Sequence, residues 1–251
     1  MRPSFVLSSS SAIAFVLPLL VALIAPTFGQ AAPATRPTAE IADDYKELAA
    51  TDPAARNAAR VRLMGMSRLD LVTLRDVVTT HLPVAPAQAV ALHDVVRHVY
   101  LASETVESNG NQGFLGVAPT RYGRGAAFVV DPDGPVDVRV GADFQSRTPG
   151  FCAYRWLQDG DVILSMGTDE MLPITSFSIL SEYVRRTPAG TTIRMRVLRG
   201  GGVVVLEFPL DARPAALDFG ADLSSFMNER SRRAEAYWQQ VFAPLIEPDH
   251  T

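Results

Sequence analysis

Residues 157–171 read LQDGDVILSMGTDEM, and residues 174–210 read ITSFSILSEYVRRTPAGTTIRMRVLRGGGVVVLEFPL. These two stretches decide the fold. The apolar run that follows Gly160 predicts a strand over 160–166. Thr175 and Ser176 are capping residues, and they predict a helix that extends to about Arg186. The segment Pro188-Ala189-Gly190 ends that helix, because proline and glycine disfavour its continuation.

The second half of the longer stretch predicts a β-hairpin. Ile193, Met195 and Val197 alternate with polar residues over 191–199, which is the period of a half-buried strand. Three glycines then turn the chain, and VVVLEFPL at 203–210 returns. A strand, a helix and a hairpin within about 100 residues indicate an α+β domain.

The segment before residue 157 contains GFLGV at 113–117, an apolar turn between two glycines. Residues 118–150 follow it, and they contain a predicted hairpin at 126–140 around the turn residues Asp131-Pro132-Asp133-Gly134. This insertion could shield or lengthen whatever surface lies next to GFLGV.

Residues 39–108 have helical periodicity instead, and short helices are expected from Ile41, over 53–64, from Ser67, and over 87–107. They predict a small all-α unit. The stretch TDPAARNAARVRLMGM resembles the start of a HEAT-like helical repeat, and a solenoid would need at least three such repeats.

The tail, residues 213–251, is expected to form one helix after Asp222 or Ser224. Its apolar side carries Phe226, Trp238 and Phe242, and Arg230 is assigned to the opposite, polar side. This helix either packs on one of the domains or binds a partner or a second copy.

The N-terminus indicates export. Residues 12–25 are uncharged and mostly apolar, and small residues follow at Gly29 and Ala31. This pattern predicts a signal peptide over 1–29, then a Pro/Ala/Thr-rich linker over 30–38, and therefore a secreted or periplasmic protein. The alternative is an uncleaved signal anchor, which would be the only contact with a membrane.

The composition argues against several functions. The chain has 251 residues, 47% of them hydrophobic, and a net charge of −4, which does not suit a nucleic-acid surface. Its one cysteine, Cys152, lies among apolar residues and is expected to be buried. The sequence shows no nucleophile elbow, metal-ligand spacing or phosphate loop, so we expect no catalytic residues, no metal and no cofactor.

The order of these pieces resembles a PDZ domain, of the type found in bacterial periplasmic serine proteases of the HtrA kind. The resemblance covers FLGV (114–117) and the two stretches quoted first, about 40% of the chain, and the protease domain is missing. It implies a partly open β-barrel with capping helices over 109–212, preceded by the helical unit and followed by the tail helix.

A PDZ domain binds a peptide as an added strand between its second strand and a helix. The resemblance therefore implies that the amides of Leu115, Gly116 and Val117 hold a terminal carboxylate. The implied peptide-binding residues are Phe114, Leu115, Gly116 and Val117 in the loop, and Phe177, Leu180, Ser181 and Val184 on the helix. Pro119 departs from the pattern, because it removes one N–H donor from the strand that would pair with the peptide.

The resulting expectation is a secreted, non-catalytic adaptor that binds C-terminal or extended peptide segments of other exported proteins. Two alternatives stay open. The chain could be a structural subunit of an envelope complex, with its groove filled in cis by residues 118–150. It could also be the regulatory partner of a separate protease.

Overall fold

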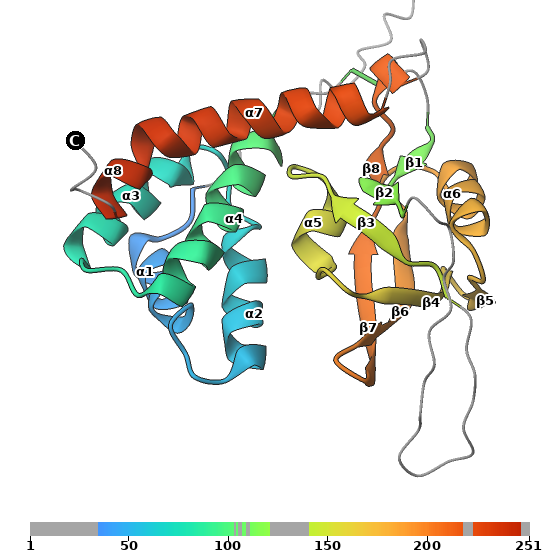
Figure 1. Ribbon diagram of the computed structural model, residues 1–251, viewed down its shortest axis with the longest axis horizontal. Helices are drawn as coiled ribbons and strands as arrows, with labels where there is room; N and C mark the ends of the chain where they lie inside the picture. The colour runs from blue at the N-terminus through green and yellow to red at the C-terminus, as the bar shows by residue number, and fades with distance from the viewer. Residues whose placement is uncertain are drawn as a thin grey trace, which may run out of the picture. The chain divides into compact units, whose positions relative to one another are not determined.

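The computed structural model describes residues 35–102, 104, 107–108, 111–120, 141–217 and 223–246 (Figure 1). The predicted signal peptide, most of the predicted linker and the predicted hairpin at 126–140 lie outside the described residues. Within the described part, no helix has both the length and the apolar character needed to cross a bilayer.

The first half of the described chain is helical. Its elements are α1 (Thr38–Glu47), α2 (Pro53–Leu63), α3 (Asp70–Thr80) and α4 (Pro86–Ala102). Asp52 caps α2 by accepting hydrogen bonds from Ala54 N and Ala55 N at 3.0 and 3.2 Å, and Pro53 occupies the first turn. The described part of α4 ends at Ala102, and most residues between there and the predicted limit of 107 lie outside the described residues.

The second half contains short helices and antiparallel strands. Its elements are β1 (Gly113–Phe114), β2 (Val117–Pro119), β3 (Phe144–Arg147), α5 (Cys152–Trp156), β4 (Val162–Gly167), β5 (Leu172–Pro173), α6 (Phe177–Arg186), β6 (Thr192–Arg199), β7 (Gly202–Pro209), β8 (Asp211–Ala212), the 3₁₀ turn η1 (Ala215–Leu217), α7 (Leu223–Val241) and α8 (Ala243–Ile246). The predicted combination of helices with antiparallel strands is confirmed at this level.

The strands of the described residues form three small sheets. One has the order β5-β4-β6-β7, and the other two are the pairs β1-β8 and β2-β3. Gly200 and Gly201 turn the β6-β7 hairpin with φ values of +57° and +86°. The described strands do not close into a barrel, and the predicted helical repeat stays a prediction.

The sheet half has its own hydrophobic core. Ile193, Met195 and Val197 point inward from β6, as their alternation predicted. Leu180 and Val184 from α6 belong to the same cluster of buried side chains, together with Leu115, which precedes β2, and Val117, which begins it. The face of α6 and the start of β2 are therefore held by one core.

Helix α7 packs against α4, and its Trp238 joins the core of the helical half together with Phe242, which directly follows α7. Ala234 on the same helix is fully buried. The prediction that Arg230 lies on the exposed, polar side of this helix was wrong. Its side chain is only 2% exposed, because it crosses from α7 to the end of α4.

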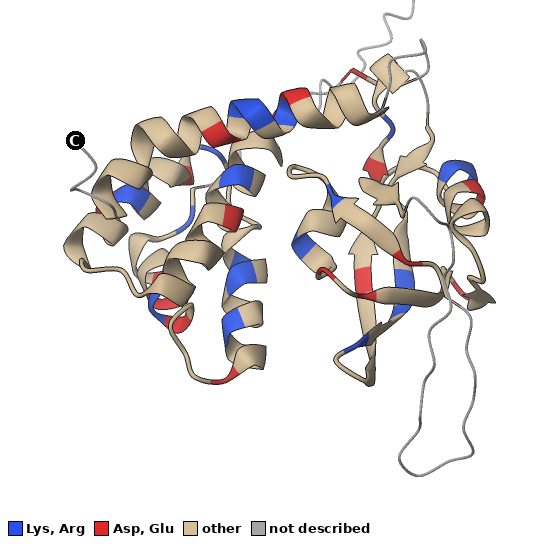
Figure 2. Ribbon diagram, in the orientation of Figure 1, with Lys and Arg blue, Asp and Glu red and all other residues tan. Residues whose placement is uncertain are grey.

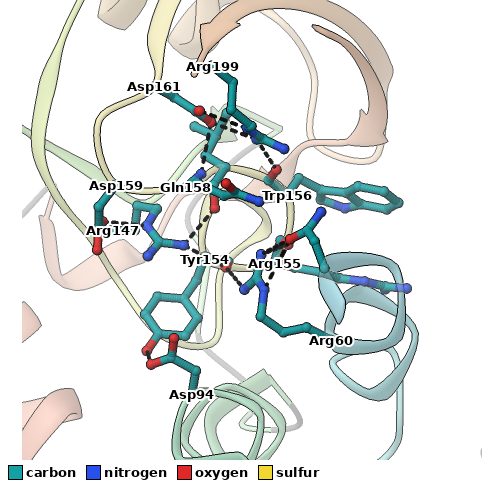
Figure 3. A network of polar contacts seen from close by, with 12 residues as sticks. Arg60, Asp94, Arg147, Tyr154, Arg155, Trp156, Gln158, Asp159, Asp161 and Arg199 are labelled. Carbon is teal, nitrogen blue, oxygen red and sulfur yellow. Dashed lines mark hydrogen bonds and ion pairs between the residues drawn. The ribbon is translucent and has the colours of Figure 1, made fainter. Parts of the chain in front are cut away.

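Helix α5 was not predicted, and two arginines of the sheet half cap its C-terminal end (Figure 3). Arg147 donates to Leu157 O at 2.6 Å, and Arg199 donates to Trp156 O at 3.1 Å. Arg199 also makes a bidentate pair with buried Asp161, at 2.7 and 2.8 Å. The last carbonyls of a helix have no partner within it, so these guanidinium groups supply the missing donors.

The helical half contacts the same end of α5 (Figure 3). Arg60 of α2 donates to Tyr154 O and Arg155 O at 3.2 and 3.1 Å. In return, Arg155 Nε donates to Val61 O at 3.0 Å, and the Tyr154 hydroxyl donates to Asp94 of α4 at 2.7 Å. These four bonds join α2, α4 and α5 through groups that are mostly removed from water.

His98 of α4 is buried beside α5. Its Nδ1 accepts a hydrogen bond from Gly150 N at 3.2 Å, and its ring stacks on Tyr154. Burial, with further contributions from nearby arginines, lowers the pKa of His98 to about 3. The imidazole is therefore neutral in the folded protein at neutral pH.

Arg60 should contribute more to stability than an exposed arginine. We expect Arg60→Met to lower the free energy of unfolding by about 2–3 kcal/mol, because it removes the buried donor to Arg155 O and one of the two arginine donors to Tyr154 O, the other being Arg147. Arg186→Met is the control, since Arg186 is exposed and Glu182 is its one ion-pair partner among the described residues, and it should cost less than about 0.5 kcal/mol. Urea denaturation followed by circular dichroism measures both. Equal losses would contradict a special role for Arg60.

His98 should make stability depend on pH. The pKa of His98 in the folded protein, about 3, lies below its value in the unfolded chain, about 6.5. Between these two pH values the unfolded chain therefore binds a proton at His98 and the folded chain does not. Stability from this source is complete above about pH 6.5 and is lost as the pH falls toward 3, by about 1.4 kcal/mol per pH unit. We expect His98→Gln to lose about 2 kcal/mol less than the wild type between pH 7.5 and 5 in urea denaturation. Parallel pH profiles would contradict this assignment.

Candidate functional site

A pocket of about 100 Å³ lies between residues 113–117, here called the pocket loop, and one face of α6. Helix α6 lies beside β1 and β2 (Figure 1). The structure brings together all eight residues that the sequence analysis singled out. The pocket lining includes Phe114, Leu115, Gly116 and Val117 from the loop, and Phe177, Leu180, Ser181 and Val184 from the helix. Their role in peptide binding stays a prediction.

The helix wall follows from the spacing of α6. Four of its five lining residues stand at positions i, i+3, i+4 and i+7, which share one face of a helix. Ser176 starts the helix by accepting a hydrogen bond from Ile179 N at 3.3 Å. Leu180 and Val184 are buried, whereas Ser181 is exposed. The wall is therefore apolar at its base and polar at its rim.

The loop wall is fastened to the C-terminal end of α6. Gly113 N donates to Thr187 O at 2.7 Å. A Cβ on Gly113 would lie 2.7 Å from Val184 O, so a larger residue could not approach the helix this closely. Gly116 has a φ of +79°, the left-handed region that favours glycine.

Residues 148–153, here called the rear segment, bind the carbonyls of the pocket loop from behind. Ala153 N donates to Leu115 O at 3.1 Å, and Thr148 N donates to Gly116 O at 2.7 Å. The thiol of Cys152 donates weakly to Phe114 O at 3.6 Å. Three successive carbonyls of the loop are thereby turned toward the rear segment.

This arrangement fixes the direction of three N–H groups. In a planar trans peptide, the N–H of each residue points opposite to the preceding carbonyl. The N–H groups of Leu115, Gly116 and Val117 therefore point away from the rear segment. The pocket lining includes these three residues and no residue of the rear segment, so the N–H groups are on the pocket side of the loop. Successive N–H groups directed to one side form a concave site that suits an anion.

The strand next to the loop presents one more edge. Val117 pairs with Arg147 of β3, and the neighbouring bond between Thr148 N and Gly116 O sets the alternation of the ladder. The N–H and C=O of Val117 therefore face away from β3. The register then shifts between Ala118 and Pro119. An added strand would find this edge usable only near Val117, because Pro119 has no N–H.

Two further residues of the pocket lining, both arginines, were not singled out from the sequence. They are Arg185 of α6 and Arg213, which follows β8, and the described lining contains no carboxylate. Basic positions mark the end of α6 in Figure 2. Helical spacing could have identified Arg185, which stands four residues after Ser181. Nothing in the sequence places Arg213 here, because it depends on the pairing of β8 with β1.

Cys152 lies in the rear segment and is buried, as the sequence predicted. Burial, together with the charge of Asp211, raises the pKa of its thiol well above the usual value. The Asp211 carboxylate accepts a hydrogen bond from Cys152 N and so caps the start of α5. The thiol stays protonated near neutral pH, and its place is structural. In the described part of the chain, no group of His, Cys, Asp or Glu side chains is arranged to hold a metal.

A larger hollow of about 690 Å³ lies elsewhere, along α7. Its described lining consists of polar and charged side chains: Arg97, Ser225, Asn228, Ser231, Arg232 and Glu235. It offers no apolar wall, whereas most known ligand sites combine apolar walls with a few directed polar groups. The pocket between the loop and α6 has both, and it is the candidate site.

No family model matches the chain, and a search of curated proteins finds no relative. The assignment of the site therefore depends on its geometry.

Gly116 should be intolerant of a side chain for two separable reasons. Alanine there would meet the unfavourable φ and would also place its Cβ 2.5 Å from Phe151 Cβ. We expect Gly116→Ala to cost about 2–4 kcal/mol of unfolding free energy. Gly190→Ala is the control, because Gly190 has a φ of +80° with nothing within 4 Å of the new Cβ, and it should cost about 1 kcal/mol. Thermal or urea denaturation distinguishes the two, and equal costs would contradict the contact with Phe151.

Proposed function

We propose that this protein binds the free C-terminal ends of other polypeptides in the pocket between the pocket loop and α6, without chemical change to them. One observation carries the proposal. The rear segment holds three successive loop carbonyls, so the N–H groups of Leu115, Gly116 and Val117 face the opposite side. An acceptor with negative charge suits three such donors.

The surroundings of these donors favour a carboxylate at the end of a chain. Arg185 and Arg213 add positive charge to the same pocket. The last side chain of the ligand would contact Leu180 and Val184, which form the apolar base of the helix wall. The residue before it would pair with Val117, as in the addition of a strand to a sheet edge.

The order of elements supports the finer interpretation of the fold. The strand β4, the helix α6 and the hairpin β6-β7 follow one another as in the PDZ domains that the sequence resembles. We propose that residues 109–212 form a domain of this type with no catalytic role. If the N-terminal segment is a signal peptide, the bound ends belong to other secreted or periplasmic proteins, and the chain is an adaptor.

The short usable edge limits the affinity. Only the backbone near Val117 can pair with a ligand before Pro119 interrupts the ladder. We therefore propose dissociation constants in the micromolar range, about −8 kcal/mol of binding free energy.

The test compares the same labelled peptides with a free and an amidated C-terminus, by fluorescence anisotropy on the full chain. We expect some free-acid peptides that end in an aliphatic residue to bind in the micromolar range. Amidation should weaken them at least about tenfold, because it removes the charge that the N–H groups and arginines contact. Arg185→Glu should weaken binding of the free acid at low salt, by about fivefold or more.

Arg186→Glu is the matched control, because it changes the same charge on the next residue, which does not line the pocket. It should leave the affinity nearly unchanged. Equal binding of acid and amide, or no binding below about millimolar concentration across a varied set of C-termini, would overturn the proposal.

A further inference from the structure

Phe151 supports the pocket loop from behind. An ideal Cβ on Gly116 would lie 2.5 Å from Phe151 Cβ, so the side chain of Phe151 occupies the space directly against the Gly116 backbone. The Phe151 ring also meets the Phe114 ring edge to face, with centroids 4.8 Å apart. Movement of Phe151 would therefore move the part of the loop that carries the N–H groups.

Arg230 of α7 contacts Phe151 from another element. Its guanidinium carbon lies 4.7 Å from the centre of the Phe151 ring and 5.7 Å from that of Phe226. A cation over an aromatic face is attracted to it, and burial strengthens the attraction. Arg230 is 2% exposed, so this contact is largely shielded from water.

The other side of the same guanidinium is fixed to the end of α4. Arg230 Nη2 donates to Leu101 O at 3.1 Å, and Nη1 donates to Glu104 Oε2 at 3.1 Å. Gly150, next to Phe151, has no side chain, and a Cβ there would collide with the guanidinium. The end of α4, Arg230, Phe151 and the pocket loop thus form one continuous series of contacts.

These contacts differ from those of the neighbouring arginine. Arg233 also pairs with Glu104, at 2.9 Å, but it is 47% exposed and has no ring contact in the described residues. Both arginines neutralise the same carboxylate, and only Arg230 reaches Phe151.

We propose that Arg230 is a positioning residue for the pocket, through which α7 and the end of α4 hold Phe151 against the pocket loop. The proposal rests on the proposed function in one respect, namely that the loop contacts the ligand. Its consequence is that the affinity of the pocket depends on a helix that lies outside the strands and helix that form it.

The test uses the full chain and measures hydrogen exchange in the absence of any peptide. The amides of Thr148 and Ala153 report on the loop, because their acceptors are Gly116 O and Leu115 O. The amide of Met195 in the central strand β6 reports on global unfolding. We expect Arg230→Met to speed exchange at Thr148 and Ala153 at least tenfold more than at Met195.

Arg233→Met is the matched control, and it should leave both loop reporters at the wild-type rate. Arg230→Lys is a milder change that keeps a positive charge near Glu104 but loses the flat guanidinium. It should alter the same two amides by a smaller factor. If Thr148, Ala153 and Met195 accelerate equally in the Arg230 variants, or if the loop reporters match the wild type, the positioning role is overturned.

Peptide affinity provides the second readout. For a free-acid peptide that the wild type binds, Arg230→Met should raise the dissociation constant at least fivefold, while Arg233→Met leaves it unchanged. An unchanged affinity in Arg230→Met overturns the coupling. If the wild type binds none of the peptides, the proposed function fails, and the exchange experiment still decides whether Arg230 positions the loop.

Discussion

The short helix α5 depends on partners from the rest of the chain at both ends. A helix of five residues forms few internal hydrogen bonds. Most N–H groups at its start therefore need acceptors elsewhere in the chain, and most carbonyls at its end need donors. Asp211 supplies an acceptor at the start, and arginines from α2, β3 and β6 supply donors at the end. Because these partners come from both halves of the described chain, α5 joins the core of the helices to the core of the strands.

The candidate site is a consequence of the same segment. The backbone that enters α5 binds the loop carbonyls, and this leaves the opposite side of the loop with directed N–H groups. The arrangement needs no polar side chain to hold an anion. It needs a rear segment fixed firmly enough to keep the loop in one orientation, which the contacts of α5 and Phe151 provide.

Local patterns in the sequence predicted the elements whose signals are local. Ser176 and the spacing from Phe177 to Val184 identified α6 and its inward face, and the alternation of β6 with the following glycines identified the hairpin. The eight proposed lining residues also meet in one pocket. Helix α6 and the hairpin follow from capping, periodicity and turn geometry, all of which act over a few residues. The eight lining residues were instead implied by the resemblance to PDZ domains.

Features that depend on distant partners could not be read in this way. Helix α5 is too short to show a periodic pattern in the sequence. It is stabilised by bonds from Arg60, Arg147 and Arg199, which are distant in the sequence or belong to other elements. Arg230 was assigned to the polar face because an arginine is usually exposed, and only the fold places Phe151 and Leu101 around it.

The shift in register at Pro119 also affects how long a ligand would stay bound. A ligand held by its end and by one strand residue has few bonds to break, so with ordinary association rates a micromolar complex would last about a second. Under the proposed function, such a protein samples many chain ends in succession and retains none of them for long.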